Sequence, residues 1–275
     1  MIPLAHITQW RNIAPWPDDL QVEQDLLLSR LLIEIFSDPL LNKALAFRGG
    51  TALHKLFFSR ALRYSEDIDL VRTSTGPIKS IIDALRNRLD PLLGEPNTRQ
   101  TQQSFKLLYY FNPEGRGDVK LRIKIEINIR ESFYCFSRQQ KHFNVQSNWF
   151  NGSANINTYE FSELIATKLR ALYQRRKGRD LFDLQQALKH PEFELSKVIQ
   201  AFEFYMKKED KMIKRDDFLK NIEAKLKHRA FTDDIAPLLS PELKQSHSSH
   251  VITGDWNLHD ASKEIEEKLI AFLPE

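Results

Sequence analysis

The sequence of 275 residues contains one cysteine, Cys135, so no disulfide can form within the chain. Without a cluster of cysteines there is also no thiolate zinc site, and we expect a protein of a reducing compartment, the cytoplasm. Glycine and proline are scarce, with 9 and 12 residues. This scarcity excludes collagen-like and low-complexity chains, which are rich in these residues.

Long hydrophobic runs are absent as well. No stretch approaches the roughly 18 apolar residues that span a bilayer, and the N-terminal MIPLAHITQW lacks the basic start and apolar core of a signal peptide. We therefore expect no membrane partner. The chain carries 40 basic and 37 acidic residues for a net charge of +3. Any nucleic-acid binding must then depend on where the charges lie, because the total is nearly neutral.

The first 150 residues mix helical and strand-like patterns. Apolar residues at three- and four-residue steps predict helices at 18–36 and within 75–92, and the alternation in DIDLVR predicts a strand at 67–72. Segments 104–111 and 119–130 flank the turn-rich NPEGRGD and predict an antiparallel hairpin. In the second of these strands one face is apolar, while the other is basic with one carboxylate, Glu126.

The Asn-, Gln- and Ser-rich stretch 138–158 is the best candidate for a domain boundary. We therefore predict an α/β (α+β) core at 1–150 and a helical domain at 151–275. Helices of the second domain are expected near 160–175, 179–190, 195–208, 215–228 and 261–272, with 240–256 as a loop or extended stretch.

Three acids are candidates for metal binding. Asp67 and Asp69 project from the same face of the predicted strand, where two carboxylates can share a hard cation such as Mg²⁺. Glu126, from a neighbouring strand, could complete a two-ion site. The alternatives are an exposed polar strand edge for the aspartates and a cross-strand ion pair with Lys or Arg for Glu126.

Gly49, Gly50 and Thr51 form a turn that enters a helix. Backbone N–H groups at such a turn can approach a phosphate, aided by the helix N-terminus and a hydroxyl, although a Gly-Gly turn can also be an ordinary connection. On the same helix, His54 and Lys55 are weaker candidates for ligand contact. The hydroxyl of Ser65, two residues before Asp67, would point towards the acids.

A basic segment follows the predicted boundary. Between 168 and 179 six cations occur without an acid, which suits a triphosphate or an RNA backbone. The alternative is a solvated helix end in which Arg179 pairs with Asp183 at i,i+4, with Asp180 as the cap of the next helix. The six cations are Lys168, Arg170, Arg175, Arg176, Lys177 and Arg179. His247 and His250 lack companion acids at ligand spacing, so we expect no zinc site.

The motifs GGTALHK, RYSEDIDL, KIEIN and ELIATKLRAL…RDLFDL together resemble the AbiEii/AbiGii-type nucleotidyltransferase toxins, which include MenT-type toxins. The match runs from about residue 47 to 184. The resemblance implies a DNA-polymerase-β-like nucleotidyltransferase core followed by a helical domain, with the active site between them. It also implies an NTP substrate, Mg²⁺ or Mn²⁺, and a toxin–antitoxin or abortive-infection system with an AbiEi-like antitoxin.

Carried over position by position, the resemblance implies that Gly49, Gly50 and Thr51 hold the nucleotide phosphates. Asp67 and Asp69 would bind metal, and Glu126, which corresponds to the acid of the family's KxEI-like strand, is a candidate third ligand. Catalytic and nucleotide-binding candidates are Asp67, Asp69, Ser65, Lys168, Arg179 and Asp183, of which Lys168 and Asp183 match the later motifs.

The acceptor of the transferred nucleotide is expected to be RNA, as the tRNA 3′ end is for some relatives. The basic strand face could bind that RNA; its cations are Lys120, Arg122, Lys124 and Arg130. Two alternatives stay open. One is a protein or small-molecule acceptor such as an antibiotic, and the other is a non-catalytic nucleotide- or RNA-binding module.

Overall fold

The computed structural model describes residues 2–60, 62–114, 119–244 and 256–275. Contacts divide the chain into two compact units. Residues 1–134 and 138–159 form a sheet unit, and residues 135–137 and 160–275 form a helical unit. The assignment of residues 1–150 and 151–275 to two functional domains stays a prediction.

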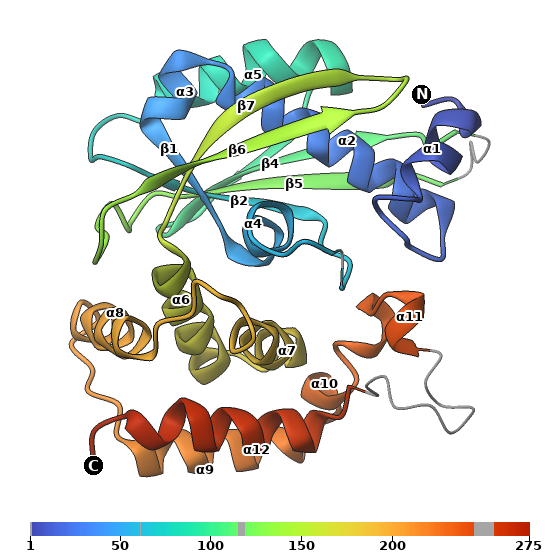
Figure 1. Ribbon diagram of the computed structural model, residues 1–275. Helices are drawn as coiled ribbons and strands as arrows, with labels where there is room; N and C mark the ends of the chain where they lie inside the picture. Colours follow the sequence, from blue (N-terminus) through green and yellow to red (C-terminus); the bar gives the residue numbers. More distant parts are fainter. Residues whose placement is uncertain (1, 61, 115–118, 245–255) are drawn as a thin grey trace. The chain divides into compact units, whose positions relative to one another are not determined.

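The sheet unit contains a seven-stranded mixed sheet in the order β3-β4-β5-β2-β1-β7-β6 (Figure 1). Strand β2 is antiparallel to β1 and parallel to β5, while β1 is parallel to β7. The strands are β1 Leu45–Arg48, β2 Asp67–Arg72, β3 Asn97–Gln100, β4 Ser104–Phe111, β5 Leu121–Asn128, β6 Gln139–Gln146 and β7 Asn151–Thr158. The mixed α/β class, the strand at 67–72 and the hairpin of 104–111 with 119–130 are thereby confirmed, although residues 115–118 of its turn lie outside the described part.

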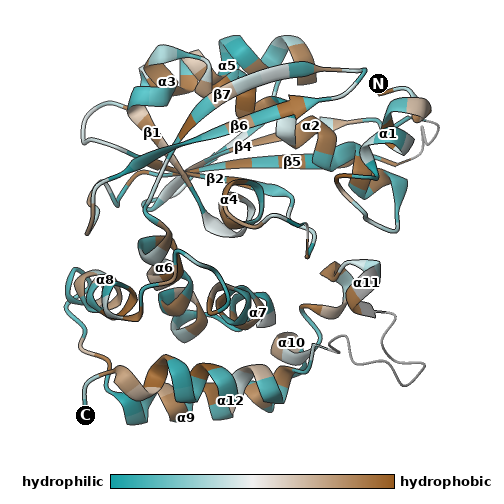
Figure 2. Ribbon diagram, in the orientation of Figure 1, coloured by the Kyte–Doolittle hydropathy of each residue, from teal (hydrophilic) through white to brown (hydrophobic). Residues whose placement is uncertain are grey.

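Helices α2, α3 and α5 cover one face of this sheet (Figure 1). The helices of the unit are α1 Leu4–Trp10, α2 Asp19–Phe36, α3 Pro39–Ala44, α4 Gly49–Leu56 and α5 Lys79–Leu93. On α5 the buried residues recur every four positions, Ile81, Leu85, Leu89 and Leu93, and hydrophilic and hydrophobic residues alternate around it (Figure 2). The strict alternation of β5 buries Ile123, Ile125 and Ile127 in the same core.

The Asn-, Gln- and Ser-rich stretch 138–158 belongs to the sheet unit, and its role as a boundary between functional domains stays a prediction. It forms the antiparallel pair β6 and β7, and β7 joins the sheet beside β1. Side-chain amides take part in this pairing, because Asn157 donates to the carbonyl of Leu45 over 3.0 Å. The polar composition of this stretch belongs to strands whose outer residues are exposed.

The helical unit packs its helices around buried aromatic residues. Its elements are α6 Phe161–Gln174, α7 Gly178–Ala187, α8 Leu195–Lys207, α9 Arg215–Leu226, α10 Arg229–Thr232, the 3-10 turn η1 Ala236–Leu238, α11 Pro241–Lys244, α12 Leu258–Lys268 and the 3-10 turn η3 Ile270–Phe272. The five predicted helices are confirmed within a few residues. Phe161, Phe182, Phe202 and Phe218 are among the largest buried side chains.

Part of the predicted loop 240–256 is the short helix α11, and residues 245–255, with His247 and His250, lie outside the described part. None of the described helices has both the length and the apolar character needed to cross a membrane.

Candidate functional site

Gly49 and Asp69 are packed directly against each other. Gly49 ends the turn from β1 into α4 with a φ of +85°, a conformation that side chains with a Cβ rarely adopt. A Cβ at this position would lie 2.5 Å from Oδ2 of Asp69. The glycine is therefore required twice, for its backbone angle and for the space that it leaves to the carboxylate.

Thr51 ties the first turn of α4 to the start of β2. Its hydroxyl donates to the carbonyl oxygen of Asp67 over 2.6 Å and lies 2.8 Å from the hydroxyl of Ser65. Because the single hydroxyl proton of Thr51 goes to Asp67, Ser65 is the donor in the second bond. The structure thus brings together the predicted glycine turn, Ser65 and the two aspartates.

A row of charged residues crosses five strands at Asp69. Arg48 of β1 is paired in register with Asp69, Asp69 with Glu126 of β5, and Glu126 with Lys106 of β4. Beyond Lys106, the partner on β3 is Arg99. Directly paired residues share a face of the sheet, so the aspartates, Glu126 and these cations form one polar surface.

Lys124 lies between the carboxylates of β2 and β5. Its ammonium nitrogen is 3.0 Å from Oδ2 of Asp67 and 3.0 Å from Oε2 of Glu126, while Lys106 lies 3.1 Å from Oε1 of Glu126. The alternative of a cross-strand ion pair for Glu126 is therefore realised. A role for Glu126 as a metal ligand stays a prediction.

The electrostatics of Asp69 fit a divalent cation. Burial raises the pKa of Asp69 above its ordinary value, and the nearby carboxylates of Asp67 and Glu126 raise it further against the opposing effect of Lys124 and Arg48. Within the described ranges no group of three or more His, Cys, Asp or Glu side chains is arranged to hold an ion. Mg²⁺ commonly binds one or two carboxylates together with substrate phosphates, and Asp67 and Asp69 match that donor set.

The N-terminus of α4 adjoins these acids. The residue at its N-cap, Arg48, provides no side-chain cap, and the guanidinium instead pairs with Glu131 at 2.6 Å. First-turn N–H groups lack partners within a helix and favour an anion. A phosphate group placed there would lie beside Asp69, because Gly49, the first residue of α4, is packed against the Asp69 carboxylate.

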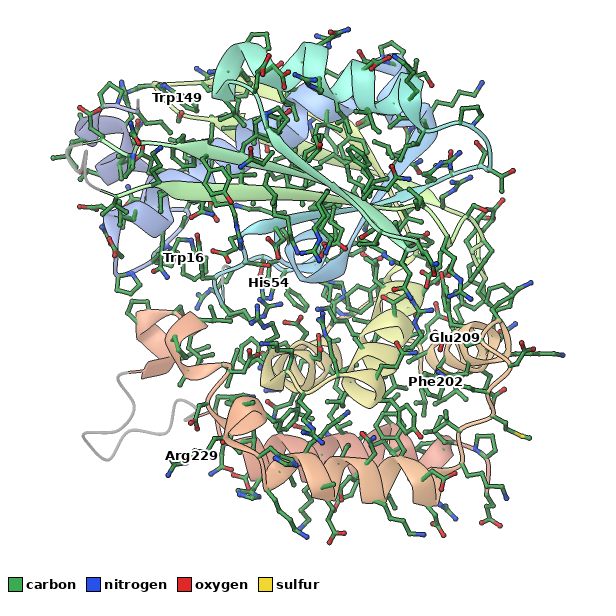
Figure 3. All side chains as sticks on the ribbon, turned by 180° about the vertical axis from the view of Figure 1, so that it is seen from behind. Trp16, His54, Trp149, Phe202, Glu209 and Arg229 are labelled. Carbon is green, nitrogen blue, oxygen red and sulfur yellow. The ribbon has the colours of Figure 1, made fainter. Side chains whose placement is uncertain are left out.

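Lys55 and His54 on α4 have other surroundings. The ammonium of Lys55 is 2.7 Å from Oδ1 of buried Asp25 and 3.0 Å from the hydroxyl of Ser29, so it anchors α4 to α2 and is not a spare cation for phosphate. His54 is buried edge-on against Phe58, with the ring centroids 5.1 Å apart. Figure 3 labels His54 on α4 and Trp16, which precedes α2. The indole N–H of Trp16 donates to the same Asp25 that pairs with Lys55.

Lys168 belongs to a buried ion-pair cluster in the helical unit. Its ammonium is 3.2 Å from Oδ1 of Asp180 and 2.8 Å from Oδ2 of Asp183, and both carboxylates are fully buried. Arg175 adds two hydrogen bonds to Asp180, of 2.7 and 2.8 Å. Burial alone would raise the pKa of Asp180, but Lys168 and Arg175 outweigh it and lower that pKa.

Two alternatives considered for this segment do not hold. Arg179 pairs with Asp234, at 2.9 Å from each oxygen, and not with Asp183. Asp180 does not cap α7, because the N-cap is Lys177 and the Asp180 carboxylate is turned to Lys168 and Arg175. The roles of Lys168, Asp183 and Arg179 in nucleotide chemistry stay predictions.

The basic run 168–179 is largely neutralised. Arg170 pairs with Glu209 at 3.4 Å and Lys177 with Asp234 at 3.1 Å, so among the described residues Arg176 is the member of the run with no acidic partner. Figure 3 labels Glu209, which follows α8. These acids lie 39 and 57 positions away in the sequence, and no local pattern indicates the pairing.

Sequence patterns also missed two cations beside the acids of this face. Arg48 is paired in register with Asp69, and Lys106 forms an ion pair with Glu126. Arg48 directly precedes the glycine turn, and Lys106 falls on the polar face of its strand. The strand register would have been needed to place either beside the carboxylates.

Comparison with known proteins gives a consistent result. Residues 30–261 match the family described as "Nucleotidyl transferase AbiEii toxin, Type IV TA system". MenT4, a nucleotidyltransferase toxin from Mycobacterium tuberculosis, superposes with a TM-score of 0.60 at 14% identity, covering 99% of this chain and 91% of its own. JHP933 from Helicobacter pylori gives 0.53 at 16% identity, covering 91% and 90%. At these identities the likeness is one of fold. No curated protein matches the sequence significantly.

Proposed function

Because the chain belongs to the AbiEii nucleotidyl transferase toxin family of type IV toxin–antitoxin systems, we propose that it transfers a nucleoside monophosphate from an NTP to RNA, at the 3′ end of tRNA. The observation that carries this proposal is the contact of Gly49 with Asp69, which puts the start of α4 beside two carboxylates of one strand face. The core is then polymerase-β-like in its chemistry.

In the proposed reaction an acceptor hydroxyl oxygen forms a bond to the α-phosphorus of the NTP. The bond from that phosphorus to the bridging oxygen breaks, pyrophosphate leaves with the electron pair, and the proton of the hydroxyl is released to water. The first turn of α4 holds the phosphates through its N–H groups, and Thr51 keeps that turn fixed to β2. Gly50 and Ser65 line the same turn.

Asp67 and Asp69 would hold Mg²⁺ or Mn²⁺, with Glu126 as a further candidate. Such an ion, when bound, neutralises phosphate charge and lowers the pKa of the attacking hydroxyl. Lys124 already balances charge at this site through its contacts with Asp67 and Glu126.

A type IV toxin has a cognate antitoxin, and we propose that it is AbiEi-like. The family resemblance further supports contributions from Lys168, Arg179 and Asp183. Because Lys168 is paired with both Asp180 and Asp183, Lys168, Asp180 and Asp183 act as one unit, and the two carboxylates keep the ammonium in place.

The decisive experiment incubates the protein with Mg²⁺, purified tRNA and each α-labelled NTP in turn. We expect label in the RNA with at least one NTP, and its loss in Asp67→Asn and Asp69→Asn. Asp83→Asn on exposed α5 is the matched control, since Asp83 pairs with Lys79 on the surface, and it should keep wild-type transfer.

Label that appears on protein or on an aminoglycoside, and not on RNA, would contradict the RNA acceptor while keeping the enzyme class. No transfer with any NTP, together with intact NTP binding, would contradict catalysis and favour a binding module.

A further inference from the structure

The polar face that carries Asp67 and Asp69 extends across three more strands, β5, β4 and β3. We propose that this extension is a binding track for single-stranded RNA. The inference rests on the proposed RNA acceptor and specifies the surface on which the RNA would bind. We name it the sheet-face track. Its residues are Arg99, Lys106, Leu108, Tyr110, Arg122 and Lys124.

Strand register places these residues on one face. Lys124 is paired with Asp67 on one side and with Leu108 on the other, and Tyr110 is paired with Arg122. The ion pairs of Lys124 with Asp67 and of Lys106 with Glu126 confirm that these side chains point to the same side. The opposite face is buried under α2 and α5, where the hydroxyl of Tyr109 donates to Asp90 over 2.8 Å.

Two cations of the track are available for phosphate. Arg99 and Arg122 are exposed, and in the described part of the chain no carboxylate pairs with either. Lys106 and Lys124, by contrast, are engaged with Glu126 and Asp67. Of these two cations Arg99 lies on the edge strand β3 and Arg122 on β5, two residues before Lys124, so an anionic chain can approach the acids from the β3 edge.

An exposed aromatic ring lies in the same track. Tyr110 is 43% exposed, and no contact of its hydroxyl is found among the described residues. Exposed aromatics between cations on an open sheet are a common platform for unstacked bases of single strands, whereas duplex RNA hides its base faces. The half-buried Leu108 beside Tyr110 adds apolar surface for a base.

The width of the track is sufficient to lead the end of an RNA strand to Asp67 and Asp69. Three strand spacings separate β2 from β3, about 14 Å at roughly 4.8 Å each. An RNA strand laid across the track would reach from Arg99 to the Asp67 carboxylate, and its terminal hydroxyl would then lie where transfer is proposed.

The test measures binding of a fluorescein-labelled 12-nucleotide single-stranded RNA to the full chain by anisotropy, without NTP. Arg99→Ser with Arg122→Ser should weaken binding about tenfold or more in moderate salt. The slope of log affinity against log salt should fall by about 1.4, since each phosphate contact on a single strand contributes about 0.7. Arg99→Lys with Arg122→Lys keeps the charge and should keep most of the affinity.

The matched control replaces two exposed lysines outside the track, Lys79→Ser with Lys214→Ser, for the same loss of charge. It should bind the 12-mer nearly as the wild type does. Circular dichroism checks that the Arg99/Arg122 double serine variant is folded. If this folded variant binds the RNA with wild-type affinity and a wild-type dependence on salt, the proposal of the track is overturned. Equal weakening by both double variants would also overturn it, because only net charge would then matter.

Tyr110 separates base stacking from charge. Tyr110→Ser should weaken binding on the order of tenfold with an unchanged salt slope, while Tyr110→Phe should bind as the wild type does. A Ser variant with wild-type affinity contradicts the platform.

Failure of the proposed function gives a different result. If the wild type binds the 12-mer through Arg99 and Arg122 but transfers no nucleotide to RNA, the track stands and the transfer proposal falls. If transfer to tRNA occurs and the double serine variant binds and transfers as the wild type does, the enzyme stands and the track falls. Affinity for a fluorescent NTP, measured in parallel, should be the same in all these variants.

Discussion

The carboxylate of Asp69 occupies the space that a side chain on Gly49 would need, with Oδ2 only 2.5 Å from the position of such a Cβ. This contact couples the backbone conformation of the glycine turn to the placement of the carboxylate. A change in either residue must therefore be felt by the other.

Gly49→Ala should abolish most of the transfer activity. The added methyl has to displace Asp69, and the φ of +85° costs a further amount of about 1–3 kcal/mol in strain. Gly94→Ala is the control, because Gly94 has a φ of +77° and no atom lies within 4 Å of the position that its Cβ would take. Both variants should lose stability in urea from the backbone strain, Gly49→Ala by more because of its clash with Asp69, but only the first should lose transfer. Wild-type activity of Gly49→Ala would show that Asp69 is not held by this contact.

Thr51→Val should destabilise the sheet unit by about 1–3 kcal/mol, because the carbonyl of Asp67 and the hydroxyl of Ser65 lose their partner in a buried place. Thr51→Ser keeps the hydroxyl and should retain most of the stability. Urea denaturation gives the stability, and titration with a fluorescent NTP shows whether the first turn of α4 still binds phosphate. Equal stability of the two variants would contradict the hydrogen-bond role.

Lys168→Met should destabilise the helical unit by about 3–5 kcal/mol, since it removes the ammonium from two fully buried carboxylates, of which Asp180 keeps its ion pair with Arg175. Combining it with Asp183→Asn should cost less than the sum of the single changes. Arg176→Ser, on an exposed cation with no acidic partner in the described ranges, should stay within about 0.5 kcal/mol of wild type. If the costs of Lys168→Met and Asp183→Asn are additive, these two charges do not interact. Activity of Lys168 variants is then measured per folded molecule.

Local periodicity made much of the fold predictable. The period of two in DIDLVR placed Asp67 and Asp69 on one side of their strand, and the period in 119–130 placed Glu126 on the polar side of its own strand, because side chains of a strand alternate whatever the strand pairs with. The register of β2 with β5 then brings the three acids to one face of the sheet. Helices such as 195–208 were likewise identified from their own apolar spacing. The common face of the two aspartates is the part of the site that sequence alone supplied.

Long-range pairing was the part that could not be predicted. Lys55 meets Asp25 across 30 positions, and Arg179 meets Asp234 across 55, so a cation that is free in the sequence is neutralised in the fold. The β6 and β7 hairpin was missed for a related reason. Its residues are polar, and Asn157 of β7 donates to the carbonyl of Leu45 on β1; such amide residues carry no strand signal of their own.

Asp234 should give the protein a specific sensitivity to acid. Burial would raise the pKa of Asp234, but hydrogen bonds from Arg179 and the attraction of its charge lower that pKa from 3.8 to about 2. A carboxyl whose pKa is lower in the folded state stabilises the fold above its unfolded pKa. The contribution is therefore complete above about pH 4 and is lost as the pH falls towards 2.

Asp234→Asn should remove this contribution, so the variant is less stable than wild type above pH 4 and the two stabilities converge as the pH falls to 2. The difference at neutral pH should be about 1–2 kcal/mol, since Arg179 and Lys177 are partly exposed and solvent screens the pairs. Urea denaturation at several pH values measures it, with Asp233→Asn on the exposed neighbour as control. Parallel curves for Asp234→Asn and wild type between pH 4 and 2 would contradict the role of this ion pair, because the loss of a group with a lowered pKa must change the slope in that interval.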